Sequence, residues 1–137
     1  MRTIKFRGKR LDNGEWLYGD LMHDNAGGYY VYPIESENLF KENKVNPNTV
    51  GQFTGLHDKH GKEIYEGDIM QYNALLRPEK YYRYVIAWNP MEMAFGCASL
   101  EHAFSDCPDI SGGAQITDSV IVGNIHDNKE LLEGESI

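Results

Sequence analysis

Two cysteines and a histidine in the last third of the chain have the spacing of metal ligands. Cys97, His102 and Cys107 follow the pattern Cys-x4-His-x4-Cys, which matches the last three ligands of a zinc knuckle. Ala94 stands where the first ligand of that knuckle would be. Because structural zinc is normally held by four protein ligands, we predict no metal here. Cys97 is then expected to behave as a small buried hydrophobic side chain.

Histidines and carboxylates gather in the centre of the chain. The segment 57–60 holds two histidines and Asp58, a set that could bind a metal or act as a general base, and Glu63, Glu66 and Asp68 resemble the paired carboxylates of hydrolases. Polar turn tips have the same composition, and an aspartate in a turn typically accepts hydrogen bonds from backbone N–H groups. We interpret both groups as structural and predict no enzymatic activity, because no nucleophile is obviously paired with a base.

Basic and aromatic residues alternate in one stretch of the second half. These residues are Arg77, Lys80, Tyr81, Tyr82, Arg83 and Tyr84. Surfaces that bind single-stranded nucleic acid use rings to stack bases and cations to contact phosphates. An exposed strand that buries its tyrosine rings has the same composition. Nucleic-acid binding by this stretch is therefore one of two hypotheses, the other being a structural role.

The overall charge limits the partners. The 137-residue chain has a formal net charge of −8, which argues against electrostatic capture of nucleic acid or anionic membranes by the molecule as a whole. Residues 1–10 are an exception, with five basic and no acidic residues. The two cysteines cannot form the disulfide framework of a secreted protein, and no segment has the composition of a signal peptide or a membrane span. We predict a cytoplasmic protein without cofactors.

Short strands separated by turns are the expected secondary structure. Apolar and polar residues alternate in residues 3–8, 15–22 and 29–34, which predicts an antiparallel meander with turns at 12–14 and 25–28. Four further strands, at residues 69–73, 81–88, 93–99 and 119–125, suit a small barrel. Helix is expected only as one turn at 129–133, where Asp127 and Glu130 have capping spacing.

Five segments together resemble a known family. They are FTGLHD at 53–58, GKEIYEGDI at 61–69, IKFRG at 4–8, GEWLYG at 14–19 and VIVGNIH at 120–126. This pattern resembles the signature of the YopX family, small proteins encoded by bacteriophages and prophages. The resemblance implies a β-rich fold with an SH3-barrel-like C-terminal half, and it implies no particular activity. The motif positions that we interpret as structural are Thr54, Gly55, Asp58, Gly61, Glu66, Gly67 and Asp68.

The sequence thus predicts a mainly β protein with an N-terminal β subdomain at residues 1–60 and an SH3-like barrel at 61–137, forming one compact unit. The favoured function is a non-catalytic binding or regulatory module of phage or prophage origin, with an unidentified protein as partner. A nucleic-acid-binding barrel is the first alternative. The second is a ribonuclease, because Gly67-Asp68-Ile69 also resembles the opening of MazF-type toxins. Self-association into a homo-oligomer is left open.

Overall fold

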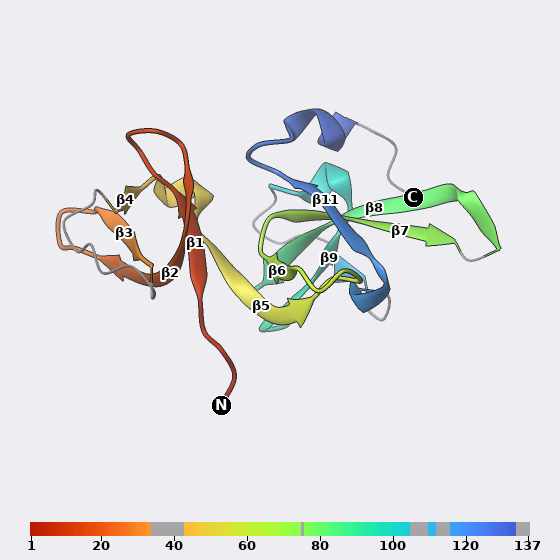
Figure 1. The fold of residues 1–137 in the computed structure, drawn as a ribbon, viewed down its shortest axis with the longest axis horizontal. Helices are drawn as coiled ribbons and strands as arrows, with labels where there is room; N and C mark the ends of the chain where they lie inside the picture. Colours follow the sequence, from red (N-terminus) through yellow and green to blue (C-terminus); the bar gives the residue numbers. More distant parts are fainter. Residues whose placement is uncertain (34–42, 75, 105–109, 112–115, 134–137) are drawn as a thin grey trace. The chain divides into compact units, whose positions relative to one another are not determined.

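The computed structural model describes residues 1–33, 43–74, 76–104, 110–111 and 116–133. The chain divides into two compact units, Met1–Gly55 and Leu56–Ile137 (Figure 1). Every strand pairing in the described residues is antiparallel, and the helical segments there are short 3-10 turns, so the predicted mainly β class is confirmed. None of the described helices is long and apolar enough to cross a membrane.

The first unit is a curled antiparallel sheet. Its strands follow the order β4-β3-β2-β1-β5, and β5 continues into the second unit. The bounds are β1 (Phe6–Lys9), β2 (Trp16–His23), β3 (Tyr29–Tyr32), β4 (Lys44–Val45), the 3-10 turn η1 (Pro47–Thr49) and β5 (Gly51–His57). The predicted N-terminal antiparallel meander is therefore confirmed, as β1, β2 and β3. The sheet curls because β4 also meets the end of β1, where Asn46 N–H donates to the Lys9 carbonyl at 2.8 Å.

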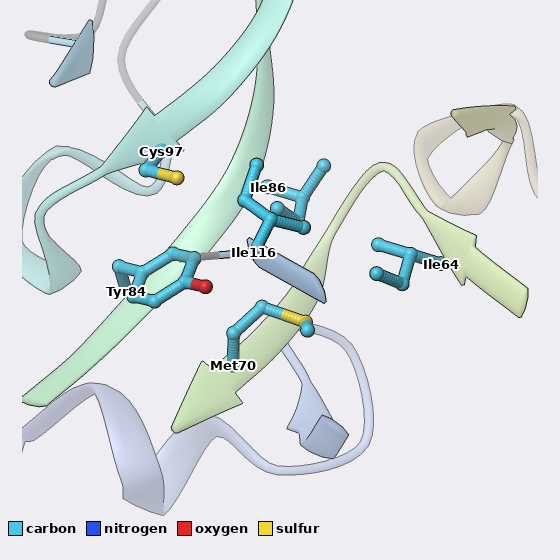
Figure 2. Close-up of a cluster of buried hydrophobic side chains, with 6 residues drawn as sticks. All are labelled: Ile64, Met70, Tyr84, Ile86, Cys97 and Ile116. Carbon is cyan, nitrogen blue, oxygen red and sulfur yellow. The ribbon is translucent and has the colours of Figure 1, made fainter. Parts of the chain in front are cut away.

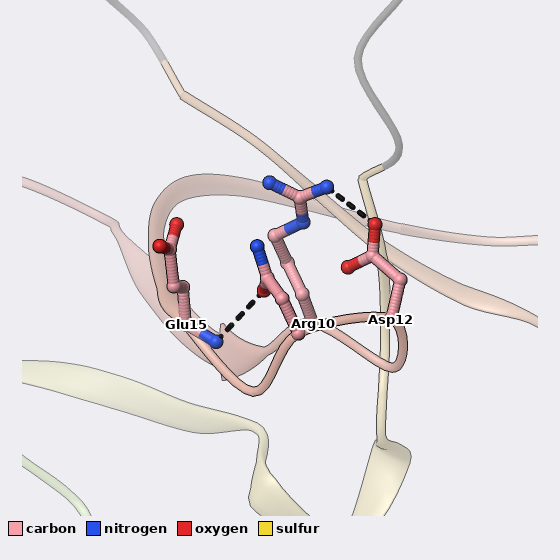
Figure 3. Close-up of polar contacts among 4 residues, drawn as sticks. Arg10, Asp12 and Glu15 are labelled. Carbon is pink, nitrogen blue, oxygen red and sulfur yellow. Dashed lines mark hydrogen bonds and ion pairs between the residues drawn. The ribbon is translucent and has the colours of Figure 1, made fainter.

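The turn between β1 and β2 follows from its Asp-Asn-Gly sequence. Gly14 has a φ of +73°, which an L side chain rarely adopts. Asn13 Oδ1 accepts a hydrogen bond of 2.9 Å from the Glu15 backbone N–H, and Arg10 forms an ion pair with Asp12 (Figure 3). These local bonds stabilise the turn and set the register that places Lys9 opposite Trp16.

The inner face of this unit is built around two valines and two glycines. Val31 and Val45 are fully buried. A Cβ atom added at Gly8 would lie 2.9 Å from a Val45 methyl group, and one added at Gly19 would lie 2.0 Å from the Tyr32 carbonyl oxygen. Both glycines therefore permit a close approach that other residues would prevent.

The second unit is a five-stranded sheet with the order β10-β9-β8-β7-β11, and the short β6 pairs with the end of β5. The predicted SH3-like barrel is not confirmed, because β10 and β11 are the two edges of this sheet and the described strands do not close into a barrel. The bounds are β6 (Glu63–Tyr65), β7 (Asp68–Ala74), β8 (Arg77–Asn89), β9 (Ala94–Ala98), η2 (Leu100–His102), β10 (Ile110–Ser111), η3 (Ile116–Asp118), β11 (Val120–Asn124) and η4 (Lys129–Glu133).

Apolar side chains cover both faces of this sheet. Neighbouring residues of a strand point to opposite faces, so Ile69 and Met70 enter different clusters. One cluster consists of Ile64, Met70, Tyr84, Ile86, Cys97 and Ile116 (Figure 2). The other contains Ile69, Val85, Leu100 and Ile125, with Leu131 and Leu132 packed against it. The predicted turn at 129–133 is confirmed as η4, and it contributes these two leucines.

Candidate functional site

The outer part of the β7–β8 hairpin carries exposed side chains, whereas its inner part belongs to the core. We call residues 71–73 and 80–83, at the outer part of this hairpin, the β7–β8 ribbon. The hairpin extends away from the other strands of its unit in Figure 1. The register pairs Gln71 with Arg83, and Asn73 with Tyr81. Because directly paired residues lie on the same face, these four side chains form one polar surface.

The side chains on this surface support one another. The Arg83 guanidinium carbon lies 4.8 Å from the centre of the Tyr81 ring, a cation–π contact. Arg83 Nε donates a hydrogen bond of 3.0 Å to Gln71 Oε1, and Gln71 Nε2 donates to Asn73 Oδ1 at 3.3 Å. Tyr81 remains 42% exposed. The result is a fixed cation beside an accessible aromatic ring.

The other tyrosines of the predicted stretch lie on the opposite face. Tyr82 pairs with Tyr72, and the centres of their rings are 6.5 Å apart. Tyr84 is buried in the core, where its hydroxyl group lies 2.6 Å from Ser119 Oγ. Burial raises the pKa of Tyr84 to about 12, although the bond to Ser119 lowers it in part. Tyr84 is therefore a core residue and contributes no ring to the surface.

Two basic residues complete the predicted set. Lys80 is exposed on β8, next to Tyr81. Arg77 is the first residue of β8, and its side chain lies outside the described part of the structure. The structure thus brings the side chains of Tyr81 and Arg83 together, whereas Lys80 is an exposed neighbour of Tyr81 in the sequence.

Asp58 organises the turn between β5 and β6. Its side chain is 7% exposed, and Oδ1 accepts hydrogen bonds of 2.9 Å from the backbone N–H groups of His60 and Lys62. Oδ2 accepts a bond of 3.1 Å from the Ile121 N–H, so this carboxylate joins the turn to β11. Burial would raise the pKa of Asp58, but the three N–H donors and the nearby His60 lower it below its ordinary value of 3.8.

Asp68 and Gly67 have a similar role before β7. Asp68 is 1% exposed, and its Oδ2 accepts a hydrogen bond of 2.7 Å from the Tyr65 N–H. Gly67 has a φ of +89°; its N–H donates to the Ile86 carbonyl at 2.8 Å and its carbonyl accepts from the Ile125 N–H at 2.9 Å. Both residues therefore make hydrogen bonds to the backbone of neighbouring segments, which is a structural role.

The remaining motif positions lie before Asp58 or between Asp58 and Asp68 in the sequence. Gly55 and Gly61 also have positive φ, at +89° and +85°, in open surroundings that leave room for a Cβ. Thr54 and Glu66 are half-buried. His57 and His60 are exposed on either side of Asp58. The motif as a whole supplies turns with left-handed glycines and carboxylates that accept backbone hydrogen bonds.

Of the three knuckle-like residues, Cys97 alone has a described side chain. Cys97 is buried in the core cluster of Figure 2, and burial raises the pKa of its thiol to about 11. His102 lies in η2 with a side chain that is not described, and Cys107 falls outside the described residues. No group of three His, Cys, Asp or Glu side chains among those described is placed to hold a metal ion.

Two residues of the polar surface were missed by the sequence interpretation. Gln71 and Asn73 alternate with Met70 and Tyr72, so the sequence shows that they share a face. Their pairing with Arg83 and Tyr81 depends on the register of the hairpin, which contains an irregularity between Asn73 and Ala74. The sequence therefore showed that Gln71 and Asn73 share a face, but it did not show which residues of β8 they pair with.

Comparisons with known proteins agree with this fold. A sequence model of the YopX protein family matches residues 5–133. The solved structure of protein EF1440 from Enterococcus faecalis is similar with a TM-score of 0.57 and 24% identity, covering 97% of this chain and 100% of that one. That of protein yopX from Bacillus subtilis is similar with a TM-score of 0.57 and 17% identity, covering 99% and 100%. A search of curated proteins found no match.

Proposed function

Because the chain belongs to the YopX family, as its match over residues 5–133 establishes, we propose that it is a non-catalytic binding module of bacteriophage or prophage origin. In this proposal it acts in the bacterial cytoplasm and holds a protein partner with the β7–β8 ribbon.

The observation that carries this proposal is the supported pair of Tyr81 and Arg83. Tyrosine and arginine are among the residues that contribute most to binding energy at protein interfaces. Here the guanidinium is already held by Gln71 and by the Tyr81 ring, so little side-chain freedom is left to lose on binding. Leu76, at the end of the same hairpin, is 92% exposed and adds apolar surface.

The division of charge between the units favours a protein as ligand of the ribbon. The second unit contains fourteen acidic and six basic residues and thus carries the whole net charge of −8. A nucleic acid would be repelled by this unit as a whole, whereas a protein can place a single carboxylate against Arg83. Nucleic-acid binding by the ribbon is the second candidate, and the contact of Arg83 with the Tyr81 ring is what favours it.

The central motif supports the non-catalytic part of the proposal. A catalytic carboxylate must reach a substrate, but Asp58 and Asp68 are buried and accept hydrogen bonds from the backbone. A MazF-type role would depend on the Gly67-Asp68-Ile69 segment, which in this fold forms the entry to β7.

We expect the variant Lys80→Ala/Arg83→Ala to lose partner binding while remaining folded. Lys80 is exposed, and the half-buried Arg83 bonds to the neutral side chain of Gln71 and contacts the Tyr81 ring. The free energy of unfolding should therefore change by no more than about 1 kcal/mol. Tagged protein would be isolated from bacterial cells that express it, and the retained proteins would be quantified by mass spectrometry. The partner signal should fall at least about tenfold.

Lys59→Ala/Lys62→Ala is the matched control, since it removes two exposed lysines from the same unit, at the β5–β6 turn. This control should retain the partner as the unmodified chain does. Equal retention by both double variants would refute a role for the ribbon. Loss of retained nucleic acid, and not of a protein, from the ribbon variant would favour the second candidate.

A further inference from the structure

The first unit has a second surface of a different kind, on the face of its sheet opposite to Val45. Lys5, Arg7 and Lys9 alternate along and just before β1, so their side chains share one face. The register places Arg7 opposite Tyr18, and Lys9 opposite Trp16. These five residues, which we call the basic–aromatic face, therefore lie on the side of the sheet opposite to Gly8 and its contact with Val45.

Cations and rings are in direct contact on this face. The Arg7 guanidinium carbon lies 4.7 Å from the centre of the Trp16 ring, and Lys9 Nζ lies 5.7 Å from the same ring. Lys5 Nζ lies 5.6 Å from the ring of Phe53 on the neighbouring β5. Tyr18 is 43% exposed, which leaves its ring accessible. Adjacent strands, about 4.8 Å apart, thus place the rings of Trp16 and Tyr18 beside the half-buried Lys5 and Lys9. Arg7 is only 5% exposed, so it holds the Trp16 ring in place and is not itself presented to a ligand.

The charge of the first unit differs from that of the second. It contains seven acidic and seven basic residues, and its first ten residues are the stretch with five basic and no acidic residues. On the strand residues of this face, Asp20 is an exposed acidic residue two positions beyond Tyr18. The cations of this face therefore outnumber its acidic residue, in a unit whose net charge is zero while the second unit carries −8.

We propose that the basic–aromatic face binds single-stranded nucleic acid. Unpaired bases stack on rings that alternate with cations, and the cations contact the phosphates. The Tyr18 ring would stack on one base. Trp16, whose ring contacts Arg7 and Lys9, would stack on the next base, and Lys5 and Lys9 would bind the phosphates. An acidic peptide or an anionic membrane offers charges to Lys5 and Lys9 but no base to stack on the Tyr18 ring. This inference concerns another surface and another ligand than the proposed function does, and either can fail without the other.

The test is the fluorescence anisotropy of labelled single-stranded DNA and RNA of about 16 nucleotides, titrated with the full-length chain at salt concentrations between about 50 and 200 mM. Tyr18→Ala should weaken binding about five- to a hundredfold, because one base loses its stacking partner, whereas Tyr18→Phe keeps the ring and should bind as the unmodified chain does. Lys5→Ala/Lys9→Ala should lower the slope of log affinity against log salt by about 1.4, the value for two phosphate contacts on a single strand.

Lys59→Ala/Lys62→Ala is again the charge-matched control, and it should bind like the unmodified chain. Thermal melting of each variant shows whether it is folded. If Lys5→Ala/Lys9→Ala is unfolded, the comparison of Tyr18→Ala with Tyr18→Phe tests the proposal by itself. The proposal is overturned if the unmodified chain does not bind, or if Tyr18→Ala binds as tightly as Tyr18→Phe. Binding of phosphatidylglycerol vesicles or polyglutamate that exceeds oligonucleotide binding, and that depends on the lysines alone, would also overturn it. Loss of oligonucleotide binding in Lys80→Ala/Arg83→Ala, with Lys5→Ala/Lys9→Ala unaffected, would assign the nucleic acid to the ribbon instead.

Discussion

Replacing Gly19 with alanine should lower the free energy of unfolding of the first unit by about 3 kcal/mol or more. The added Cβ would lie 2.0 Å from the Tyr32 carbonyl oxygen and 2.9 Å from the Pro33 Cα, both backbone atoms. Since neither atom can rotate away, β2 and β3 would have to separate. Trp16 is the tryptophan of the first unit and Trp88 that of the second, so urea denaturation followed by Trp16 fluorescence in a Trp88→Phe background measures this effect.

Gly28→Ala in the same hairpin is the appropriate comparison. A Cβ there would meet the Asp24 carboxylate and the Tyr30 hydroxyl group at 2.9 Å, and both are ends of side chains that can move. Gly28→Ala should therefore cost about 1 kcal/mol. If Gly19→Ala proved as stable as Gly28→Ala, the close approach of β2 and β3 would not be a requirement of this fold.

Asp58→Ala should destabilise the second unit by about 2 to 3 kcal/mol, because three backbone N–H groups would lose a charged acceptor. They belong to His60, Lys62 and Ile121, and the last of these lies 63 positions along the chain. Asp58→Asn keeps an acceptor oxygen and should recover part of this loss. Denaturation followed by Trp88 fluorescence, in a Trp16→Phe background, would measure both variants.

The contribution of Asp58 should also depend on pH in a defined direction. Its pKa in the folded chain is lower than the ordinary value of 3.8. The stabilisation is therefore fully present above that ordinary value, and it is lost as the pH falls through the lower folded value. The stability difference between the unmodified chain and Asp58→Asn should be constant near neutral pH and shrink in acid below about pH 4. A difference that shrinks with rising pH instead would contradict this role for the carboxylate.

Local patterns were sufficient to predict most of the strands. The alternation in residues 15–22 and the Asp-Asn-Gly turn before it gave the first hairpin, because side-chain period and turn chemistry are properties of adjacent residues. Strands β4, β6 and β10 were missed, since two or three residues are too few to show a period. The barrel expected for the second half depends on which edges meet, and the observed order leaves β10 and β11 at opposite edges.

The candidate surfaces could be predicted only in part, for the same physical reason. The sequence identified Tyr81 and Arg83, but burial of Tyr84 and support by Gln71 depend on the pairing of β7 with β8. The five bases of residues 1–10 were visible as a cluster of charge. Their contact with Trp16 required the register of β1 against β2, which no single segment determines.

The central claim is that the ribbon binds the partner, whereas the central motif stabilises the fold. Site-specific photocrosslinking in bacterial cells tests it most directly, with a benzophenone amino acid placed at Tyr81 of the ribbon or at His60, an exposed position of the motif. Both positions are accessible, so they differ in location and not in exposure. We expect a protein adduct of defined mass from the probe at position 81 and none from the probe at position 60. An adduct from position 60 alone would show that the motif is the binding site, and would contradict this account.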